Sequence, residues 1–289
     1  MAEKQYISPI RLFDHLGIEY QDGINIARIK KHLNAEFSMA KDGFIEVDGH
    51  SYNRNDIIEE LDRPDFETRM AYHQRIYKQH FLLVLLEDNE DNLPEVHTAL
   101  ESFQRDPVFD EFFSPYFAGP FNMAARTCIN SNDLSGLGEW FTLEAFLLPA
   151  DREAAFASTR IFLEENERVF RNISNENYGT FRPKVEPWLR YGWYKFLNNL
   201  PPEFDHHREG IAVSLINLTV SLQKSNKEDC RDISNNLVQV RELSPDLHKT
   251  IHNNDKVFNG SASSGSPNYW WVLWIVIILL RIGASGGCN

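Results

Sequence analysis

Apolar side chains recur every three or four positions through most of this chain, a spacing that predicts amphipathic helices. Between residues 24 and 39 the apolar positions are Ile24, Ile26, Ile29, Leu33 and Phe37. The same periodicity predicts helices over residues 9–16, 55–61, 65–87, 94–105, 133–148, 152–169, 211–222, 233–240 and 245–258. Phenylalanines crowd residues 107–121, where large rings at this density indicate a buried core.

Residues 44–52 interrupt the helical pattern with the sequence Phe-Ile-Glu-Val-Asp-Gly-His-Ser-Tyr. Asp48-Gly49 is a dipeptide preferred in two-residue type I′ turns, which need positive φ at both positions. A β-hairpin is therefore predicted here, between helices on either side. We interpret residues 1–63 as a structural cap or partner-docking module, because their excess of acidic residues argues against DNA binding.

The pattern as a whole predicts a mainly α protein, a multi-helix cytosolic domain with a small N-terminal α+β hairpin module and a C-terminal hydrophobic, transmembrane helix. We divide it into the helix–hairpin–helix module of residues 1–63 and a helical domain of residues 64–258. A Gly/Ser-rich tether over residues 259–268 and a hydrophobic tail over residues 269–285 follow. A Gly/Ser-rich stretch behaves as a flexible coil, so it suits a link between separate bodies.

The tail begins with twelve apolar residues without a break, Tyr-Trp-Trp-Val-Leu-Trp-Ile-Val-Ile-Ile-Leu-Leu. At 1.5 Å per residue this run would span about 18 Å as a helix, and extension to Ser285 gives about 17 residues, the lower limit for crossing a bilayer. Tryptophans gather at its near end as in an aromatic belt, and an arginine at its far end can extend to the interface. The predicted anchor residues are Tyr269, Trp270, Trp271, Trp274, Ile275, Ile277, Leu280 and Arg281.

Two other interpretations of the tail remain open. A run of twelve apolar residues also fits a buried core helix or strand of the soluble domain. A helix lying in the membrane plane is a third possibility, although the run lacks the polar face that such helices carry. The flexible tether favours the anchor, because such a link has no purpose before an element docked in its own core.

The first residues show no apolar run behind a basic start, so no secretory signal is predicted. We therefore expect a single-pass, tail-anchored membrane protein whose main domain is cytoplasmic. The N-glycosylation sequons at Asn172, Asn217 and Asn259 are then chance matches.

The composition and charge of the chain mainly exclude some classes of partner and some kinds of fold. The chain of 289 residues is 42% hydrophobic and 25% charged, which is ordinary for a folded protein. Its net charge of −13 argues against nucleic acid as a partner, since binding depends on neutralising phosphates. Three cysteines, Cys128, Cys230 and Cys288, are too few and too scattered for a disulfide framework.

No standard catalytic or nucleotide-binding motif is present, and we predict neither a cofactor nor a metal. His248, His252 and Asp255 share a helix face that a divalent ion could use, but a polar surface explains them better. His73 and His80 are interpreted as histidines flanking a core. The polar run of residues 205–209, Asp-His-His-Arg-Glu, lacks identifiable partners in the sequence.

Residues 181–200 combine arginines with tryptophans and tyrosines, a composition found both in cores and at protein interfaces. The candidate partner-binding residues there are Arg182, Trp188, Arg190 and Tyr191.

We expect a membrane-tethered interaction or scaffold protein that recruits a protein partner. An enzyme with a pocket of His, Asp and Glu is the first alternative, and enzymatic activity is left open as the weaker hypothesis. The second alternative is a membrane effector whose tail is masked in the soluble domain.

Overall fold

The computed structural model describes residues 5–20, 25–88, 92–103 and 106–259, and these residues are mainly helical, as predicted. The chain divides into two compact units, Met1–Phe162 and Leu163–Asn289, which are described separately below. The predicted module of residues 1–63 lies within the first unit. The predicted tail of residues 269–285 and most of its tether lie outside the described residues. Within the described ranges, no helix is both long enough and apolar enough to cross a membrane.

The first unit begins with two helices, a hairpin and a third helix. These are α1 (Pro9–His15), α2 (Ile26–Met39), the 3₁₀ turn η1 (Lys41–Gly43), β1 (Phe44–Val47), β2 (His50–Asn53) and α3 (Arg54–Leu61). It continues with α4 (Phe66–Lys78), α5 (His80–Asp88), α6 (Leu93–Glu101), α7 (Pro107–Asn130), α8 (Leu134–Trp140), the 3₁₀ helix η2 (Phe141–Phe146), α9 (Arg152–Ala155) and the start of α10 (Ala157–Arg171).

The predicted hairpin is present, and its turn has the expected geometry. Strands β1 and β2 pair antiparallel, with Val47 opposite His50. The two residues between them have positive φ, 52° at Asp48 and 85° at Gly49, as a type I′ turn requires. Within the described part of the chain this pair forms a two-stranded sheet, and the remaining regular structure is helical.

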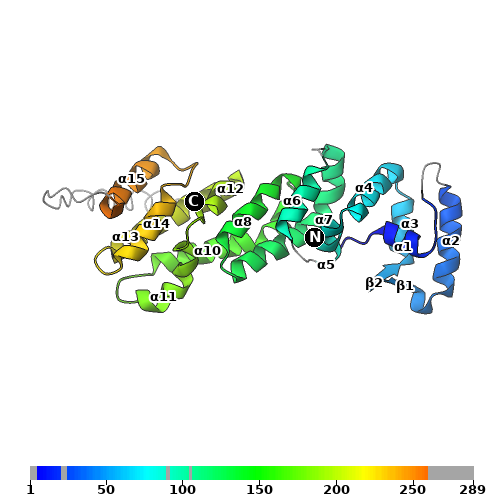
Figure 1. Ribbon diagram of the computed structural model, residues 1–289, viewed down its shortest axis with the longest axis horizontal. Coiled ribbons are helices and arrows are strands. Elements are labelled where there is room, and N and C mark those ends of the chain that lie inside the picture. Colours follow the sequence, from blue (N-terminus) through cyan, green and yellow to red (C-terminus); the bar gives the residue numbers. More distant parts are fainter. Residues whose placement is uncertain (1–4, 21–24, 89–91, 104–105, 260–289) are drawn as a thin grey trace, which may run out of the picture. The chain divides into compact units, whose positions relative to one another are not determined.

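The hairpin packs into a core of its own with α1, α2, α3 and α4, the elements coloured blue to cyan in Figure 1. Fully buried members include Phe13, Leu33 and Tyr52, which come from three different elements. Because the hairpin alone has too little apolar surface to be stable, the helices around it complete the core.

The single helix predicted over residues 65–87 is wrong: the structure breaks it at Gln79, between α4 and α5. The backbone there leaves the helical region, with ψ of 85°. No glycine or proline marks the break, so the sequence lacks the usual signal for it. After the break, Phe81 is 40% exposed, whereas Leu82 and Leu83 are buried.

A similar break divides the helix predicted over residues 152–169. Phe156 separates α9 from α10 with ψ of 5°. On α10, Ile161 is exposed, whereas Leu163 and Phe170 are buried. The helix predicted over residues 133–148 also changes type, because α8 continues as η2 after Trp140.

The phenylalanine-rich segment forms α7, and its rings line the core as predicted. Phe109, Phe113 and Phe117 stack on one another along the helix, with centroid separations of 5.1 and 4.9 Å. Pro115 and Pro120 lie inside this helix. Each removes one backbone hydrogen bond and normally disfavours a helix interior. Burial of the aromatic face compensates for that cost.

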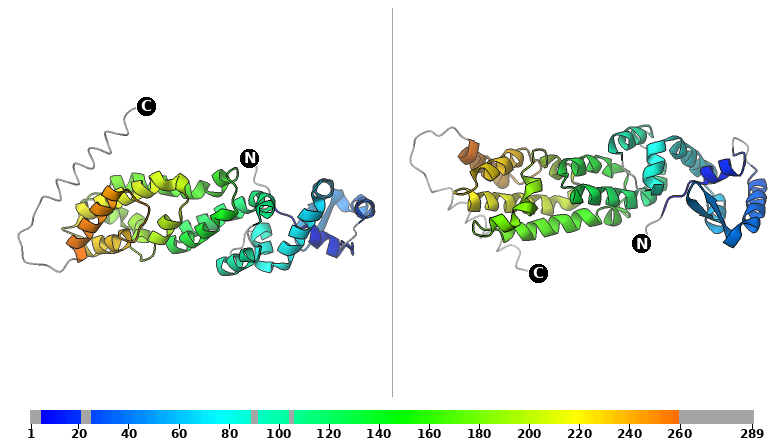
Figure 2. Two further views of the ribbon diagram at one scale, coloured as in Figure 1. Left: turned by 90° about the horizontal axis from the view of Figure 1, so that it is seen from above. Right: turned by 60° about the horizontal axis from the view of Figure 1, so that its bottom comes forward.

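The second unit consists of short helices followed by three longer ones. After α10 come α11 (Tyr178–Val185), η3 (Glu186–Trp188), α12 (Tyr194–Asn199), η4 (Pro202–Phe204), α13 (Asp205–Leu222), α14 (Lys227–Leu237) and α15 (Pro245–Asn259). The last three pack side by side, as the yellow and orange ribbons of Figure 2 show. The core of the unit contains Trp188, Trp193 and Phe196.

Candidate functional site

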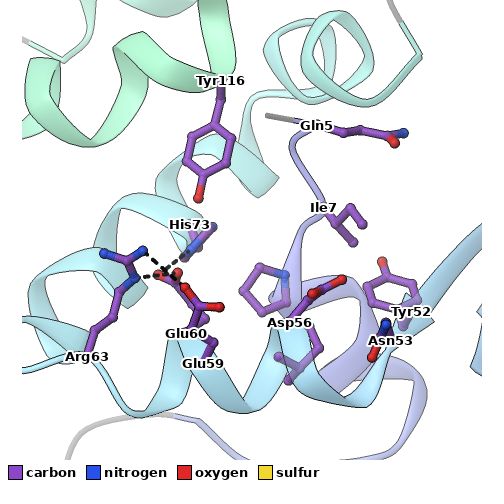
Figure 3. A pocket seen from close by; sticks show the side chains of 12 residues that line it. Gln5, Ile7, Tyr52, Asn53, Asp56, Glu59, Glu60, Arg63, His73 and Tyr116 are labelled. Atoms are coloured by element: carbon purple, nitrogen blue, oxygen red, sulfur yellow. Dashed lines mark hydrogen bonds and ion pairs between the residues drawn. The ribbon is translucent and has the colours of Figure 1, made fainter. Parts of the chain in front are cut away.

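A cavity of about 370 Å³ opens in the first unit, and its close-up is shown in Figure 3. Three lining residues come from the segment around the start of α1, seven from the end of the hairpin and α3, and one each from α4 and α7. Its walls combine the tyrosine rings of Tyr52 and Tyr116 with aliphatic groups such as Ile7. We refer to this cavity as the α3 pocket. Its size lies at the small end of the range for ligand pockets.

The Glu60 carboxylate forms the centre of a polar network on one side of the α3 pocket (Figure 3). Arg69 donates to both of its oxygens, with Nη2 at 3.0 Å from Oε2. His73 Nε2 lies 3.2 Å from Oε1, and Arg63 Nε lies 3.3 Å from Oε2. Three cationic or histidine side chains therefore compensate this one carboxylate.

The network continues inward to Tyr6, whose hydroxyl lies 2.9 Å from His73 Nδ1. Burial raises the pKa of Tyr6 well above its ordinary value, and the charge of Glu87 adds to the effect. The phenol therefore keeps its proton at neutral pH, and the two ring nitrogens of His73 link the Tyr6 hydroxyl to the Glu60 carboxylate. A Tyr–His–Glu chain arranged in this way positions the pocket wall.

The pKa of Glu60 results from opposing effects. Burial raises it, but the hydrogen bonds from His73 and Arg69 and the charges of those groups outweigh burial and lower it to about 2. Glu60 is accordingly ionised at neutral pH, and its charge is already balanced by its neighbours.

A buried carboxylate, Glu87 near the end of α5, holds the segment that contributes Ile7 to the pocket. Its oxygen accepts from the backbone N–H of Ser8 at 3.0 Å, and it forms an ion pair with Arg11. Tyr52 donates to the carbonyl of the same serine at 3.2 Å. The chain that carries Ile7 into the pocket is thus held from both sides.

The mouth of the α3 pocket is acidic. Asp56 and Glu59 lie one turn apart on α3, and both are exposed. Glu59 has an ion pair at 3.7 Å with Arg63, whereas Asp56 makes no hydrogen bond or ion pair within the described part of the chain. This site was not predicted from the sequence. The acidic residues of α3 can be read from the sequence, but nothing in the sequence indicates that the segment around Ile7 lies opposite them.

Of the four predicted partner-binding residues, one is buried and three are exposed. Trp188 is fully buried against Trp193, with its indole N–H donating to Asn166 Oδ1 at 3.0 Å. Arg182, Arg190 and Tyr191 are exposed. A role in partner binding stays a prediction for this segment, and its exposed members are the ones in a position to reach a partner.

The predicted anchor residues, from Tyr269 to Arg281, lie outside the described residues. The histidine candidates are placed differently from one another. His73 is buried, as predicted, whereas His80 is exposed.

The remaining candidates make local contacts within the second unit. His252 Nδ1 donates to the carbonyl of His248 at 3.0 Å, and Asp255 accepts from Ser234. Across the described ranges, no group of three or more histidine, cysteine or acidic side chains is placed to hold a metal ion.

The polar run of residues 205–209 has a structural role in the second unit. Arg208 is 1% exposed and donates to the carbonyls of Leu197 and Leu200, at 2.8 and 2.5 Å. Its neighbour His207 lies 2.8 Å from Glu167 on α10. The hydrogen-bonding groups of Arg208 and His207 are therefore paired within the fold.

No protein-family model, curated protein or solved structure matches this chain. The α3 pocket, the distribution of charge and the tail sequence are consequently the observations that bear on function.

Proposed function

We propose that this chain is an interaction or scaffold protein tethered to a membrane by its C-terminal tail. The observation that carries the proposal is the run of twelve apolar residues from Tyr269 to Leu280. On insertion scales, each Leu, Ile, Val or Phe at the centre of a membrane helix contributes about −0.3 to −0.6 kcal/mol. A run of this length without a charge therefore favours the bilayer over water.

Two flanking features support the same proposal. Trp270 and Trp271 stand at the near end of the run, where amphipathic rings favour the headgroup region. Residues 259–268, rich in glycine and serine, join the run to the end of α15. A flexible link of this kind lets a folded domain move above the surface that holds the tail.

The proposal can be tested on the full chain with two variants that add the same charge at different places. The tail variant carries Ile275→Arg and Ile278→Arg, and the matched control carries Ser263→Arg and Ser264→Arg in the tether. An arginine at the centre of a membrane helix costs about 2.5–3.5 kcal/mol, whereas the tether stays in water in both states. The measurement is flotation with phospholipid vesicles after washing with carbonate and high salt.

We expect the unaltered chain and the tether control to float with the vesicles and the tail variant to remain at the bottom of the gradient. Equal flotation of all three proteins, or a soluble monomeric wild-type chain without detergent, would contradict the proposal and favour a tail packed in the fold.

A further inference from the structure

The negative charge of this protein is concentrated in one unit. Residues 1–162 carry 28 aspartates and glutamates against 15 lysines and arginines, whereas residues 163–259 carry 14 against 13. The net charge of −13 therefore comes from the first unit, because the second unit and the tail nearly cancel. A strongly acidic surface attracts basic partners and raises their rate of encounter.

Within that unit, the α3 pocket combines a cavity with a carboxylate at its mouth that is unpaired among the described residues, Asp56, and a weakly paired one, Glu59. Glu60 is neutralised by Arg69, His73 and Arg63, so it stabilises the wall and has little charge left for a ligand. Asp56 has no partner within the described residues, and the 3.7 Å ion pair of Glu59 is long and exposed. An incoming cation would therefore meet Asp56, which is unpaired in the described part of the chain, and Glu59, whose partner Arg63 it would have to displace.

Deeper in the pocket the walls are suited to an alkyl chain. Ile7, Pro9 and Ile57 contribute aliphatic surface, and Tyr52 and Tyr116 contribute rings. Lysine and arginine bury their methylene groups against surfaces of this kind and keep the charged group near carboxylates or ring faces. An anionic ligand such as a phosphate would instead be repelled by Asp56 and Glu59.

We propose that the α3 pocket binds a lysine or arginine side chain presented by a basic segment of a partner protein. The aliphatic part of that side chain lies against the walls, and the charged group pairs with Asp56 and Glu59. This inference rests on the proposed role in protein interaction and adds the chemistry of the partner. A purely structural role for Asp56, as a negative charge in the first turn of α3, is the competing explanation.

The test uses the full chain in a mild neutral detergent. Fluorescence anisotropy measures binding of a labelled peptide of alternating lysine and glycine, with a glutamine–glycine peptide as the uncharged comparison. The pocket variant is Asp56→Asn with Glu59→Gln. The matched control is Glu46→Gln with Glu111→Gln, which removes two charges from exposed positions of the same unit where the structure shows no ion pair.

We expect the lysine peptide to bind and the glutamine peptide not to bind. The pocket variant should bind the lysine peptide about tenfold more weakly, because it removes both carboxylates at the mouth. The control should bind less than about twofold more weakly, because Glu46 and Glu111 do not line the pocket. Equal loss in the two variants would show attraction by net charge alone and would overturn the proposal, as would failure of the wild type to bind.

A third variant keeps the test decisive if Asp56→Asn lowers the melting temperature through α3. Gln5 is exposed at the pocket rim, and Gln5→Trp would cover the mouth without changing the charge. Weaker binding by this variant supports the pocket, and unchanged binding contradicts it. Displacement of the peptide by free lysine at an equal concentration would overturn the assignment to a peptide segment in favour of a small amine.

The outcome can be separated from that of the membrane proposal by floating the same preparation with vesicles. Peptide binding without flotation would support the pocket proposal and contradict membrane attachment by the tail. Flotation without peptide binding would support membrane attachment and contradict the pocket proposal.

Discussion

Glu60 is partly buried and Glu87 is buried in the same unit, but their pKa values are shifted in opposite directions. The hydrogen bonds and charges of His73 and Arg69 overcome burial at Glu60 and lower its pKa. At Glu87 burial dominates and raises the pKa, although the Ser8 N–H and Arg11 partly offset it. The difference follows from geometry, because Arg69 contacts both oxygens of Glu60.

Glu60→Gln should lower stability in a pH-dependent way. The folded pKa of about 2 is below the ordinary value of 4.5, so the stabilisation is present above pH 4.5 and is lost as the pH falls toward 2. After allowance for solvent screening, we expect a loss of about 2 kcal/mol at pH 7. Urea denaturation followed by circular dichroism at pH 7, 5 and 3 should show this deficit shrinking with acidification. The same deficit at pH 3 as at pH 7 would contradict the assignment.

Arg208 illustrates a residue whose charge matters less than its shape. Its planar group reaches two carbonyls and Asp205 at once, which a lysine cannot do. We expect Arg208→Lys to destabilise the protein by about 2–3 kcal/mol, because buried acceptors lose their donors. Arg182→Lys, at an exposed ion pair with Asp229, is the control and should leave the melting temperature nearly unchanged. Similar melting of the two variants would refute this role.

At the scale of elements, the sequence was most informative where the signal was local. The hairpin was predicted from Asp48-Gly49, whose preference for positive φ is independent of the rest of the fold. The break at Gln79 was missed because both halves of the predicted helix are apolar on one side. Packing of α4 and α5 against different neighbours sets that break, and a single periodic pattern does not encode it.

Two glycine substitutions should change stability in opposite directions. A methyl group at Gly49 or at Gly179 would meet no atom within 4 Å, so steric contacts do not decide either case. Gly49 has φ of 85°, and alanine there should cost about 1–2 kcal/mol. Gly179 lies in α11, where alanine should gain up to about 1 kcal/mol. Thermal melts that move in the same direction for both variants would contradict the turn geometry.

At the scale of the whole molecule, the helical class and the acidic character followed from the sequence, but the α3 pocket did not. Its walls come from residues near Ile7, Tyr52, His73 and Tyr116, which are far apart in the chain. Their contact depends on the tertiary fold, and no local pattern reports it. His73 was correctly predicted to lie near a core, but its partners Tyr6 and Glu60 were not.

The order of charged and apolar segments along the chain bears on the proposed membrane attachment. The chain joins a strongly acidic unit to an apolar tail through a second, nearly neutral unit. Because anionic membrane surfaces repel acidic domains, the order along the chain separates the acidic unit from the tail in sequence. The proposed membrane attachment therefore requires that the tail by itself binds membranes.

The most direct measurement is to attach residues 260–289 to an unrelated soluble fluorescent protein and to follow the fusion by microscopy and flotation. We expect this segment alone to carry the fusion to membranes, and Ile275→Arg with Ile278→Arg to return it to the soluble fraction. A fusion that stays soluble, or one whose membrane binding survives both arginines, would show that the tail is not a hydrophobic anchor.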